Sequence, residues 1–326
     1  MKELEREILI IGAGPAGISA AIEAAKAGAK VTVADEHDTI GGQLYKQIHK
    51  FFGAADNHAG MRGFEIARKL EQEAKELGVE FWLNTVAYGI FKEGVGIVRD
   101  GDNFIVKAKK VIVAAGGIEN TTAFPGSTLP GVMLAGAAQT MTNIHRVLPG
   151  KRMVVVGSGN VGLIVAYQML QAGAEVLAVV ERDDHIGGYG VHAEKIRTAG
   201  VPILTDTIIK CASGKTSVEG VTTVKLGADG AEIAGSEQIL DAEIVLIAAG
   251  FLGSQKYITD AFGVELNERT NVKTAPGKYQ TSVENVFVTG DMHRGQSLVV
   301  WAIREGREAA HAVDESLMGY SNLVIQ

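Results

Sequence analysis

The sequence contains a single cysteine, Cys211, in 326 residues. One thiol cannot form an internal disulfide, a C-x-x-C redox pair, or a four-thiolate zinc or iron–sulfur site. Cys211 also follows an apolar run (TIIK, 207–210), where a small buried residue is the ordinary interpretation. Thiol chemistry within this chain is therefore not expected.

The sequence also lacks a basic field and an uninterrupted apolar run. Its 31 Lys and Arg residues are outnumbered by 38 Asp and Glu residues, which argues against binding to a nucleic-acid backbone. The apolar stretch 8–22 is broken by glycine and proline and ends at Glu23, too short to span a bilayer. The N-terminus, MKELEREILI, has no signal-peptide pattern. We expect a cytoplasmic protein with no membrane or nucleic-acid partner, and His185 and His192 lack the further ligands that a metal site needs.

What is abundant is glycine, with 41 residues, and two glycine-rich turns stand in the same context. In each, a β-branched strand leads into G-x-G-x-x-G, a helical stretch ending at glycine, a second strand and an acidic residue, which is the βαβ pattern of a dinucleotide-binding site. The first turn comprises Gly12, Gly14, Pro15, Ala16 and Gly17, with Asp35 as the acid; the second comprises Gly157, Gly159, Asn160, Val161 and Gly162, with Glu181.

Each part of this pattern has a physical purpose. The first glycine allows a tight bend, the second lets a pyrophosphate approach the backbone, and the third lets the helix pack on the strand. The helix N-terminus offers free N–H groups to phosphate, and the acid accepts hydrogen bonds from ribose. Glu36 competes with Asp35, because the first copy is one residue shorter here. A tight strand-to-helix connection without a ligand is the alternative for either turn taken alone.

The two copies resemble each other beyond the turns. The segment DEHDTIGGQ (35–43) is echoed by ERDDHIGGY (181–189), and KKVIVAAGG (109–117) by AEIVLIAAGF (242–251). An internal duplication is the economical explanation. A length of 326 residues, 46% of them hydrophobic, is also enough for two domains of about 150 residues each.

Several motifs resemble the flavoprotein oxidoreductases that have two dinucleotide-binding domains, the class of thioredoxin reductase. They are GGQL (41–44), VIVAAGG (111–117) and TSVENVFVTGD (281–291). The C-terminal segment MHRGQSLVVWAIREGREAAHAV (292–313) resembles the small subunit of glutamate synthase. By this resemblance FAD is held at the first turn with further contacts from Gly42, Gln43, Ala115, Gly116, Gly290, Asp291, Gln296, Ser297 and Leu298.

The resemblance implies an α/β fold of two Rossmann-like domains, with an NAD(P)-binding domain inserted into a discontinuous FAD-binding domain. The expected boundaries are 1–118 and 251–326 for the FAD domain, and 119–250 for the NAD(P) domain, which closes at Gly250. NADH is expected over NADPH, because Glu181 can accept from a free 2′-hydroxyl and would repel a 2′-phosphate. Arg182 is the reservation, since it could pair with that phosphate.

Both positions where relatives carry a disulfide relay lack cysteine here. A narrower resemblance, over 41–52 and 118–139, links the chain to flavoprotein subunits of heteromeric amine and opine oxidases, among them the alpha subunit of sarcosine oxidase and one component of hydrogen cyanide synthase. It implies hydride transfer between NAD(P)H and FAD in the electron-transfer subunit of an amine, amino-acid or hydroxy-acid dehydrogenase or oxidase.

The expected partner is another redox subunit, either a flavoprotein or an iron–sulfur protein, and a homo-oligomer is also open. Tyr45, Phe51 and Phe52 could contact this partner, and packing within the FAD domain is the alternative role for them. The alternatives are a stand-alone NAD(P)H oxidase or acceptor reductase and a non-catalytic nucleotide-binding scaffold. No catalytic side chain is assigned, because a hydride step requires no acid or base.

Overall fold

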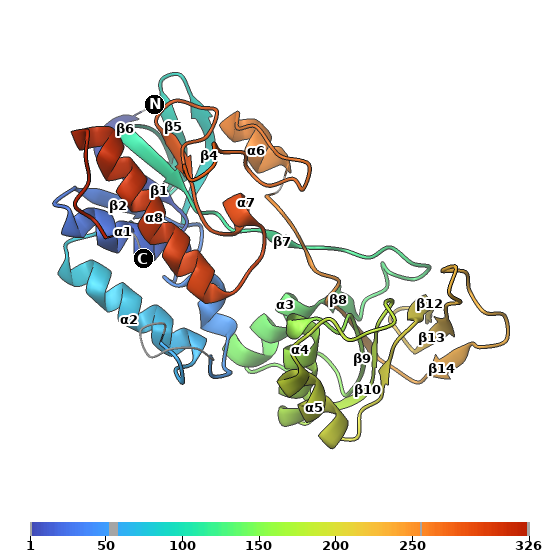
Figure 1. Cartoon of the computed structure of the whole chain (residues 1–326). Helices are drawn as coiled ribbons and strands as arrows, with labels where there is room; N and C mark the ends of the chain where they lie inside the picture. Colours follow the sequence, from blue (N-terminus) through green and yellow to red (C-terminus); the bar gives the residue numbers. More distant parts are fainter. Residues whose placement is uncertain (1, 52–57, 255, 325–326) are drawn as a thin grey trace. The chain divides into compact units, whose positions relative to one another are not determined.

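The computed structural model describes residues 2–51, 58–254 and 256–324 (Figure 1). The chain forms two compact units: residues 1–118 together with 251–326, and residues 119–250. Short strands β7 (Ile118–Glu119) and β16 (Phe251–Leu252) lie where the chain passes from one unit to the other. We call these the first and the second unit.

A seven-stranded sheet forms the centre of the first unit, in the order β3-β2-β1-β6-β5-β4, with β17 also paired to β6. Its strands are β1 (Lys2–Ile11), β2 (Val31–Ala34), β3 (Glu80–Trp82), β4 (Thr85–Phe91), β5 (Gly94–Arg99), β6 (Asp102–Val113) and β17 (Val286–Val288). Strands β3, β2, β1, β6 and β17 run parallel, while β5 pairs antiparallel with the first half of β6. The second half of β6 is therefore left for β17.

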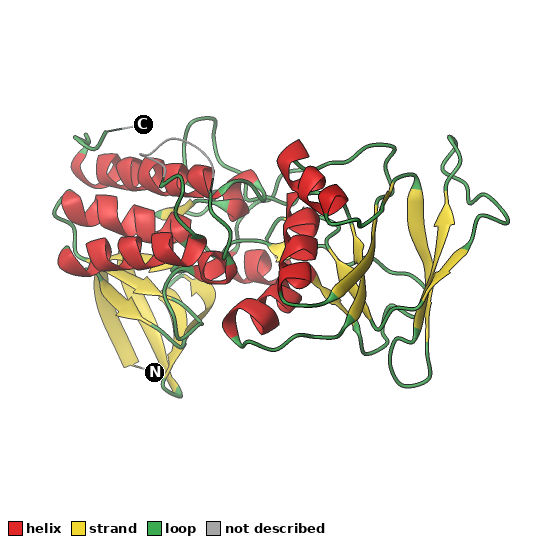
Figure 2. Ribbon diagram, turned by 90° about the horizontal axis from the view of Figure 1, so that it is seen from below, coloured by secondary structure: helices red, strands yellow, loops and turns green. Residues whose placement is uncertain are grey.

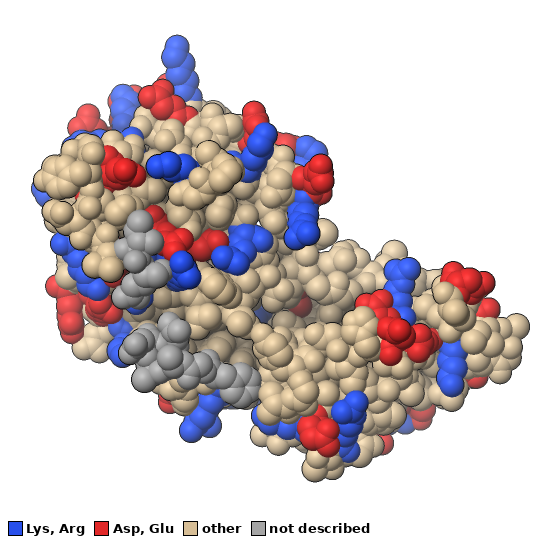
Figure 3. All heavy atoms as spheres, viewed as in Figure 1, with Lys and Arg blue, Asp and Glu red and all other residues tan. Residues whose placement is uncertain are grey.

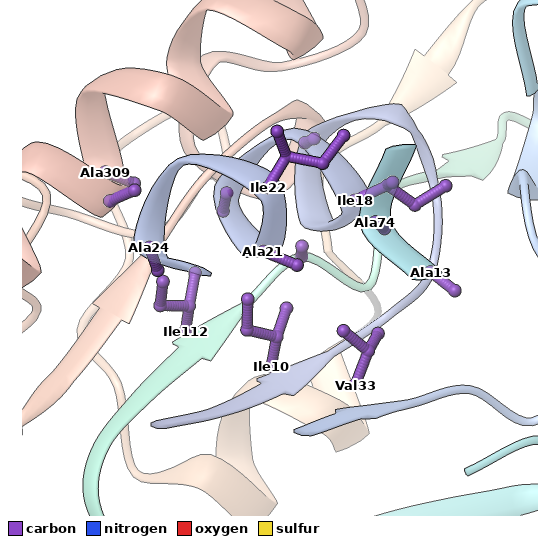
Figure 4. Close-up of a cluster of buried hydrophobic side chains, with 14 of the residues drawn as sticks. Ile10, Ala13, Ile18, Ala21, Ile22, Ala24, Val33, Ala74, Ile112 and Ala309 are labelled. Carbon is purple, nitrogen blue, oxygen red and sulfur yellow. The ribbon is translucent and has the colours of Figure 1, made fainter. Parts of the chain in front are cut away.

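Three long helices cover one face of this sheet, α1 (Pro15–Lys26), α2 (Gly63–Glu76) and α8 (Val299–Met318) (Figure 2). The shorter helices are η1 (Gly42–Lys46), α6 (Lys256–Phe262) and α7 (Asp291–Arg294). Alanine-rich faces let the helices come close: Ala24 of α1 and Ala309 of α8 belong to one buried cluster with Ile112 of β6 (Figure 4). Segments that are far apart in sequence, α1 and α8, thus lie side by side (Figure 1).

The second unit has a five-stranded parallel sheet in the order β11-β10-β9-β15-β8 and a separate antiparallel sheet, β12-β13-β14. The strands are β8 (Val132–Leu134), β9 (Arg152–Val156), β10 (Glu175–Val180), β11 (Ile203–Leu204), β12 (Thr207–Ser213), β13 (Gly220–Lys225), β14 (Gln238–Leu240) and β15 (Ile244–Ile247). The helices are α3 (Ala135–Gln139), the π-helical turn η3 (Thr140–Ile144), α4 (Asn160–Gln171) and α5 (Gly190–Thr198).

The parallel strands of the two large sheets repeat one order. In each, the strand before the glycine turn (β1 or β9) lies between the strand that ends at the acid (β2 or β10) and a later strand (β6 or β15). A fifth strand completes each repeat, β17 beside β6 and β8 beside β15, with Val286 opposite Val111 and Val132 opposite Val245. The predicted α/β fold with parallel sheets is confirmed.

Two surface properties bear on function. No helix within residues 2–51, 58–254 and 256–324 combines the length and apolar character that crossing a bilayer requires. On the face drawn in Figure 3, cationic and anionic side chains are interspersed rather than gathered by sign.

Candidate dinucleotide-binding sites

In the first turn, two of the three glycines are required by the fold. Gly12 has a φ of +105°, and a Cβ there would lie 2.4 Å from the carbonyl oxygen of Ala114. A Cβ at Gly17 would lie 1.9 Å from the Gly12 carbonyl oxygen. Gly14, which caps α1, has an ordinary φ of −74° and no atom within 4 Å of its Cβ position. The turn therefore leaves open space at its second glycine.

The second turn repeats these properties one by one. Gly157 has a φ of +102°, and its Cβ would lie 2.4 Å from the Ala248 carbonyl oxygen. A Cβ at Gly162 would lie 2.0 Å from the Gly157 carbonyl oxygen, whereas Gly159 again has no atom within 4 Å. In both turns, the fold itself does not require the second glycine. This glycine is the one that a pyrophosphate needs in order to approach the backbone.

Each acid is held beside its turn by the same pair of backbone donors. Asp35 accepts from the N–H of Ala13 (2.6 Å) and of His37 (2.9 Å). Glu181 accepts from the N–H of Ser158 (2.7 Å) and of Asp183 (3.1 Å). Each acid thus accepts one hydrogen bond from the second residue of its glycine turn. It accepts another from the residue two positions after the acid itself.

This comparison separates Asp35 from Glu36. Glu36 is exposed and occupies the position of Arg182 in the second copy, whereas Asp35 is buried against the turn. Burial by itself would raise the pKa of Glu181, but hydrogen bonds from Ser158 and from the Asp183 and Arg182 backbone together hold the pKa below its ordinary value. Glu181 is therefore an anion at neutral pH, with acceptor capacity to spare for a hydroxyl.

The segment after each acid folds back over the turn. Gly41 N–H donates to the Ala13 carbonyl (2.8 Å), and Gly188 N–H donates to the Ser158 carbonyl (2.9 Å). Gly42 has a φ of +52°, and its Cβ would lie 2.9 Å from the Gly14 Cα, so this close approach requires glycine. The neighbouring Gln43 is exposed.

The helix starts differ. Asn160 accepts from the N–H of Tyr189 (2.8 Å), a hydrogen bond that Pro15 cannot imitate. Ala16 is buried and Val161 half-buried in the first turn of the two helices.

The strand that packs on the first glycine completes each site. In the first unit β6 leads to Ala115, which is exposed, and Gly116, with a φ of +74°. In the second unit β15 leads to Gly250, with a φ of +85°. Neither glycine has an atom within 4 Å of its Cβ position. Turn, acid and following strand therefore meet at one end of each parallel sheet.

Asp291 lies in the segment that follows β17, the fifth strand of the first unit. Strand β17 leads to Gly290, whose φ is +71° and whose Cβ would lie 2.8 Å from the Cβ of Ala16. Burial raises the pKa of Asp291 to about 6, with a further upward contribution from the charge of Glu305, against a lowering hydrogen bond from the Ser297 backbone. Gln296 and Leu298 are exposed directly before α8 begins.

Two residues of α8 that the sequence pattern did not single out support this segment. Glu305 is 3% exposed and accepts hydrogen bonds from residues 290–294. Gly306 lets α8 approach α1, since a Cβ there would lie 2.2 Å from the Ala16 carbonyl oxygen. A glycine inside a helical pattern is a recognised sign of close packing, and could have identified Gly306.

Of the aromatic residues proposed as a partner contact, Tyr45 and Phe51 pack against the hydrophobic core of the first unit. Phe52 lies outside the described residues. Within the described part of the chain, no group of three or more His, Cys, Asp or Glu side chains is placed to hold a metal ion.

The donor and acceptor sets of both sites fit a dinucleotide. Each offers a helix N-terminus with free N–H groups, open space at the second glycine for a pyrophosphate, and a carboxylate beside the turn for a ribose. A Cβ at Gly14 or Gly159 would point into that space without touching the protein.

Comparison with known proteins agrees with this geometry. The chain is 32% identical to the glutamate synthase [NADPH] small chain of Mycobacterium tuberculosis over 97% of its own length and 68% of that protein. It is 29% identical to an opine oxidase subunit of Rhizobium meliloti, covering 87% of this chain and 58% of that one. Thioredoxin reductase of T. acidophilum shares the fold, with a TM-score of 0.79 at 22% identity, covering 96% of this chain and 99% of that one. Residues 6–306 match the pyridine nucleotide-disulphide oxidoreductase family, and the chain is a member of that family.

Proposed function

We propose that this protein is an FAD-dependent pyridine-nucleotide oxidoreductase that transfers hydride between NAD(P)H and FAD. The observation that carries the proposal is the repeated arrangement of turn and acid, once in each unit, around Asp35 and Glu181. When bound, the nicotinamide and the flavin supply the hydride chemistry, and the protein supplies binding and orientation.

FAD is assigned to the first unit because only its fifth strand leads to a carboxylate. By strand register, Asp291 follows β17 at the position where Ala137 follows β8. A carboxylate can accept from the hydroxyls of a ribityl chain, whereas an alanine cannot. The second unit then takes the nicotinamide cofactor.

We infer that electrons leave by a route other than a thiol relay. The sequence has only Cys211, which lies half-buried on β12, and exchange with a disulfide substrate needs a resolving second thiol. The glutamate synthase and opine oxidase relatives are named as parts of larger enzymes, and this chain spans about two thirds of the first and 58% of the second. We therefore propose an electron-transfer subunit that works with a second redox subunit on an amine, amino acid or hydroxy acid, as in the sarcosine oxidase and hydrogen cyanide synthase systems.

NADH is the proposed nicotinamide substrate. The Glu181 carboxylate is ionised and fixed at the end of β10, where it would accept from a 2′-hydroxyl and repel a 2′-phosphate. The exposed Arg182 is the residue that would favour NADPH instead, because it could pair with a 2′-phosphate. NADPH is the cofactor in the printed name of the mycobacterial relative.

The first experiment is to extract and identify the flavin of the purified protein, and then to compare kcat/KM for NADH and NADPH with an artificial electron acceptor. We expect FAD, faster turnover with NADH, and no change in dye reduction in a Cys211→Ser variant. Bound FMN, or thioredoxin or glutathione reduction at ordinary enzymatic rates, would contradict the proposal.

Co-expression with neighbouring reading frames, followed by size-exclusion chromatography, tests for the partner. A homodimer that turns over a small acceptor at full rate, unaffected by any partner, would favour a stand-alone oxidase.

A further inference from the structure

Glu305 is a buried carboxylate that gathers three donors from one short segment. Its Oε2 accepts from the N–H of Gly290 (3.2 Å) and Nδ1 of His293 (3.1 Å), and its Oε1 accepts from Nε of Arg294 (3.0 Å). All three donors lie within residues 290–294. Because a buried carboxylate is costly unless it is paired and hydrogen-bonded, this arrangement stabilises one conformation of the segment over others.

The segment is also held on its other sides. Because a carboxylate only accepts, His293 Nδ1 carries the proton in its bond to Glu305, and its Nε2 pairs with Thr274 Oγ1 at 3.0 Å. A Cβ at Gly290 would lie 2.8 Å from the Cβ of Ala16, so the segment has no room to move toward α1. Glu305 of α8 therefore holds residues 290–294, and Gly290 at their start packs against Ala16 of α1.

Asp291 is the second residue of this segment, and it is the residue that the proposed function assigns to the flavin. It follows the Gly290 N–H that Glu305 holds, and it precedes both Glu305-bound side chains by two and three residues. Glu305 therefore holds the chain on both sides of Asp291.

The second unit holds its equivalent position by the same kind of contact from an unrelated part of the chain. By strand register Gly136 corresponds to Gly290, and its N–H donates to the Glu119 carboxylate at 2.9 Å. A carboxylate on this backbone N–H therefore occurs in both units, although Glu119 precedes its glycine and Glu305 follows its own.

We propose that Glu305 is a positioning residue for the flavin site, which orients Asp291 toward the ribityl chain by holding the Gly290–Arg294 segment. This assignment rests on the proposed function of the first unit. Glu305 makes no contact with the cofactor in this assignment, and its effect passes through the backbone of Gly290 and the side chains of His293 and Arg294.

The test is a Glu305→Gln variant of the full chain. Glutamine keeps the shape but replaces one acceptor oxygen with an NH2 donor, so at least one of the three donors loses its acceptor. We expect FAD to bind at least tenfold more weakly by flavin fluorescence, and the absorption bands of the flavin bound at saturation to shift toward those of free FAD.

Glu308→Gln is the matched control, one turn further along α8. Glu308 accepts from the Tyr279 hydroxyl and from Arg304 Nε (2.7 Å) rather than from residues 290–294, although the Tyr279 ring lies 5.1 Å from the ring of His293. We expect its FAD affinity within about twofold of wild type and an unchanged flavin spectrum, at a comparable loss of folding stability. Equal effects of the two variants on affinity and spectrum would overturn the positioning role.

Arg294→Gln serves if Glu305→Gln does not fold, because the Arg294 side chain is 41% exposed and tolerates substitution better. We expect the same spectral shift and about threefold weaker FAD binding, and an unchanged spectrum and affinity would overturn the proposal. Wild-type protein that binds no FAD would overturn the proposed function itself. If the wild-type protein binds FAD and the Glu305→Gln variant has the same FAD affinity and flavin spectrum, only the role of Glu305 would be overturned.

Discussion

The two units build the same glycine turn, the same acid contact and the same strand order, but they complete their sheets from opposite directions along the chain. In the first unit the fifth strand, β17, comes after all the others and leads to Asp291. In the second unit the fifth strand, β8, comes before all the others and leads to Ala137. The shared turn and acid are suited to the pyrophosphate and ribose that two dinucleotides have in common. The ends of the fifth strands, at Asp291 and Ala137, are where the two sites differ.

The surroundings of the helices differ in the same way. In the first unit α8 packs on the start of α1 with no room for a side chain at Gly306. In the second unit the helix that follows the fifth strand is the short α3, and α4 packs against α3 and α5. Four sets of substitutions can break or sharpen this comparison.

The largest effect is expected at the second glycine of each turn. Gly14→Val and Gly159→Val each place a side chain where the protein has open space, so both variants should fold. We expect Gly14→Val to lose FAD affinity by more than about 100-fold with folding stability retained, and Gly159→Val to keep FAD but raise KM for NADH by a similar factor. Flavin content and steady-state kinetics measure this. A flavin-replete Gly14→Val protein would contradict the assignment of the first unit.

Asp291 should make the folding stability of the flavin-free protein depend on pH. Its counterpart Ala137 has no titratable side chain and cannot have this effect. Its pKa rises from 3.8 to about 6 on folding, so its contribution to stability is complete below pH 3.8 and is lost as the pH rises through 6. A shift of about two pKa units corresponds to at most ~3 kcal/mol. Relative to wild type, Asp291→Asn should therefore be more stable at pH 8 than at pH 4, by urea unfolding of the flavin-free proteins. Parallel pH curves would refute this.

Glu181 should affect the nicotinamide and leave the flavin alone. Removing its carboxylate in Glu181→Ala removes an acceptor for the ribose 2′-hydroxyl and a repulsion toward a 2′-phosphate. We expect kcat/KM for NADH to fall about tenfold and kcat/KM for NADPH to hold or rise, at full FAD content. Asp35→Ala is the counterpart in the first unit and should lower FAD retention instead. A wild-type preference for NADPH would defeat this prediction.

The smallest effect is expected at Gly306, where two influences oppose each other. Helix propensity favours alanine over glycine by about 1 kcal/mol, while the 2.2 Å approach of a Cβ to the Ala16 carbonyl oxygen forces α8 away from α1 at a cost of about 2 kcal/mol. Gly306→Ala should therefore be destabilised by about 1 kcal/mol, seen as a lower thermal midpoint. Gly159→Ala, which meets no atom, is the control and should not be destabilised. A stabilised Gly306→Ala would mean that the contact yields easily.

The sequence predicts those parts of the fold and of the site that depend on neighbouring residues. The βαβ units around Gly14 and Gly159 were predictable because turn, helix and acid follow one another within one short segment. The choice between Asp35 and Glu36 was not predictable. It depends on which of the two side chains accepts the Ala13 N–H at the end of β2, and only the fold shows this.

The fifth strands escaped prediction for a different reason. The segments 132–134 and 286–288 are equivalent in space but lie on opposite sides of their repeats, so a comparison in chain order cannot align them. The contribution of Glu305 could not be predicted either. A glutamate in a helical pattern is ordinarily interpreted as solvent-exposed, and its hydrogen-bond donors come from a segment whose position is known only from the fold.

The opposite origins of β8 and β17 also determine the order in which the units can be finished during synthesis. Every strand of the second unit's parallel sheet lies within residues 119–250, so that sheet can close once residue 250 has left the ribosome. The first unit begins earlier, but the second half of β6 keeps an unpaired edge until residues 286–288 arrive. The unit that starts first is therefore the one that closes last, and the nascent chain carries an open β-edge for the whole time in which the inserted unit is made.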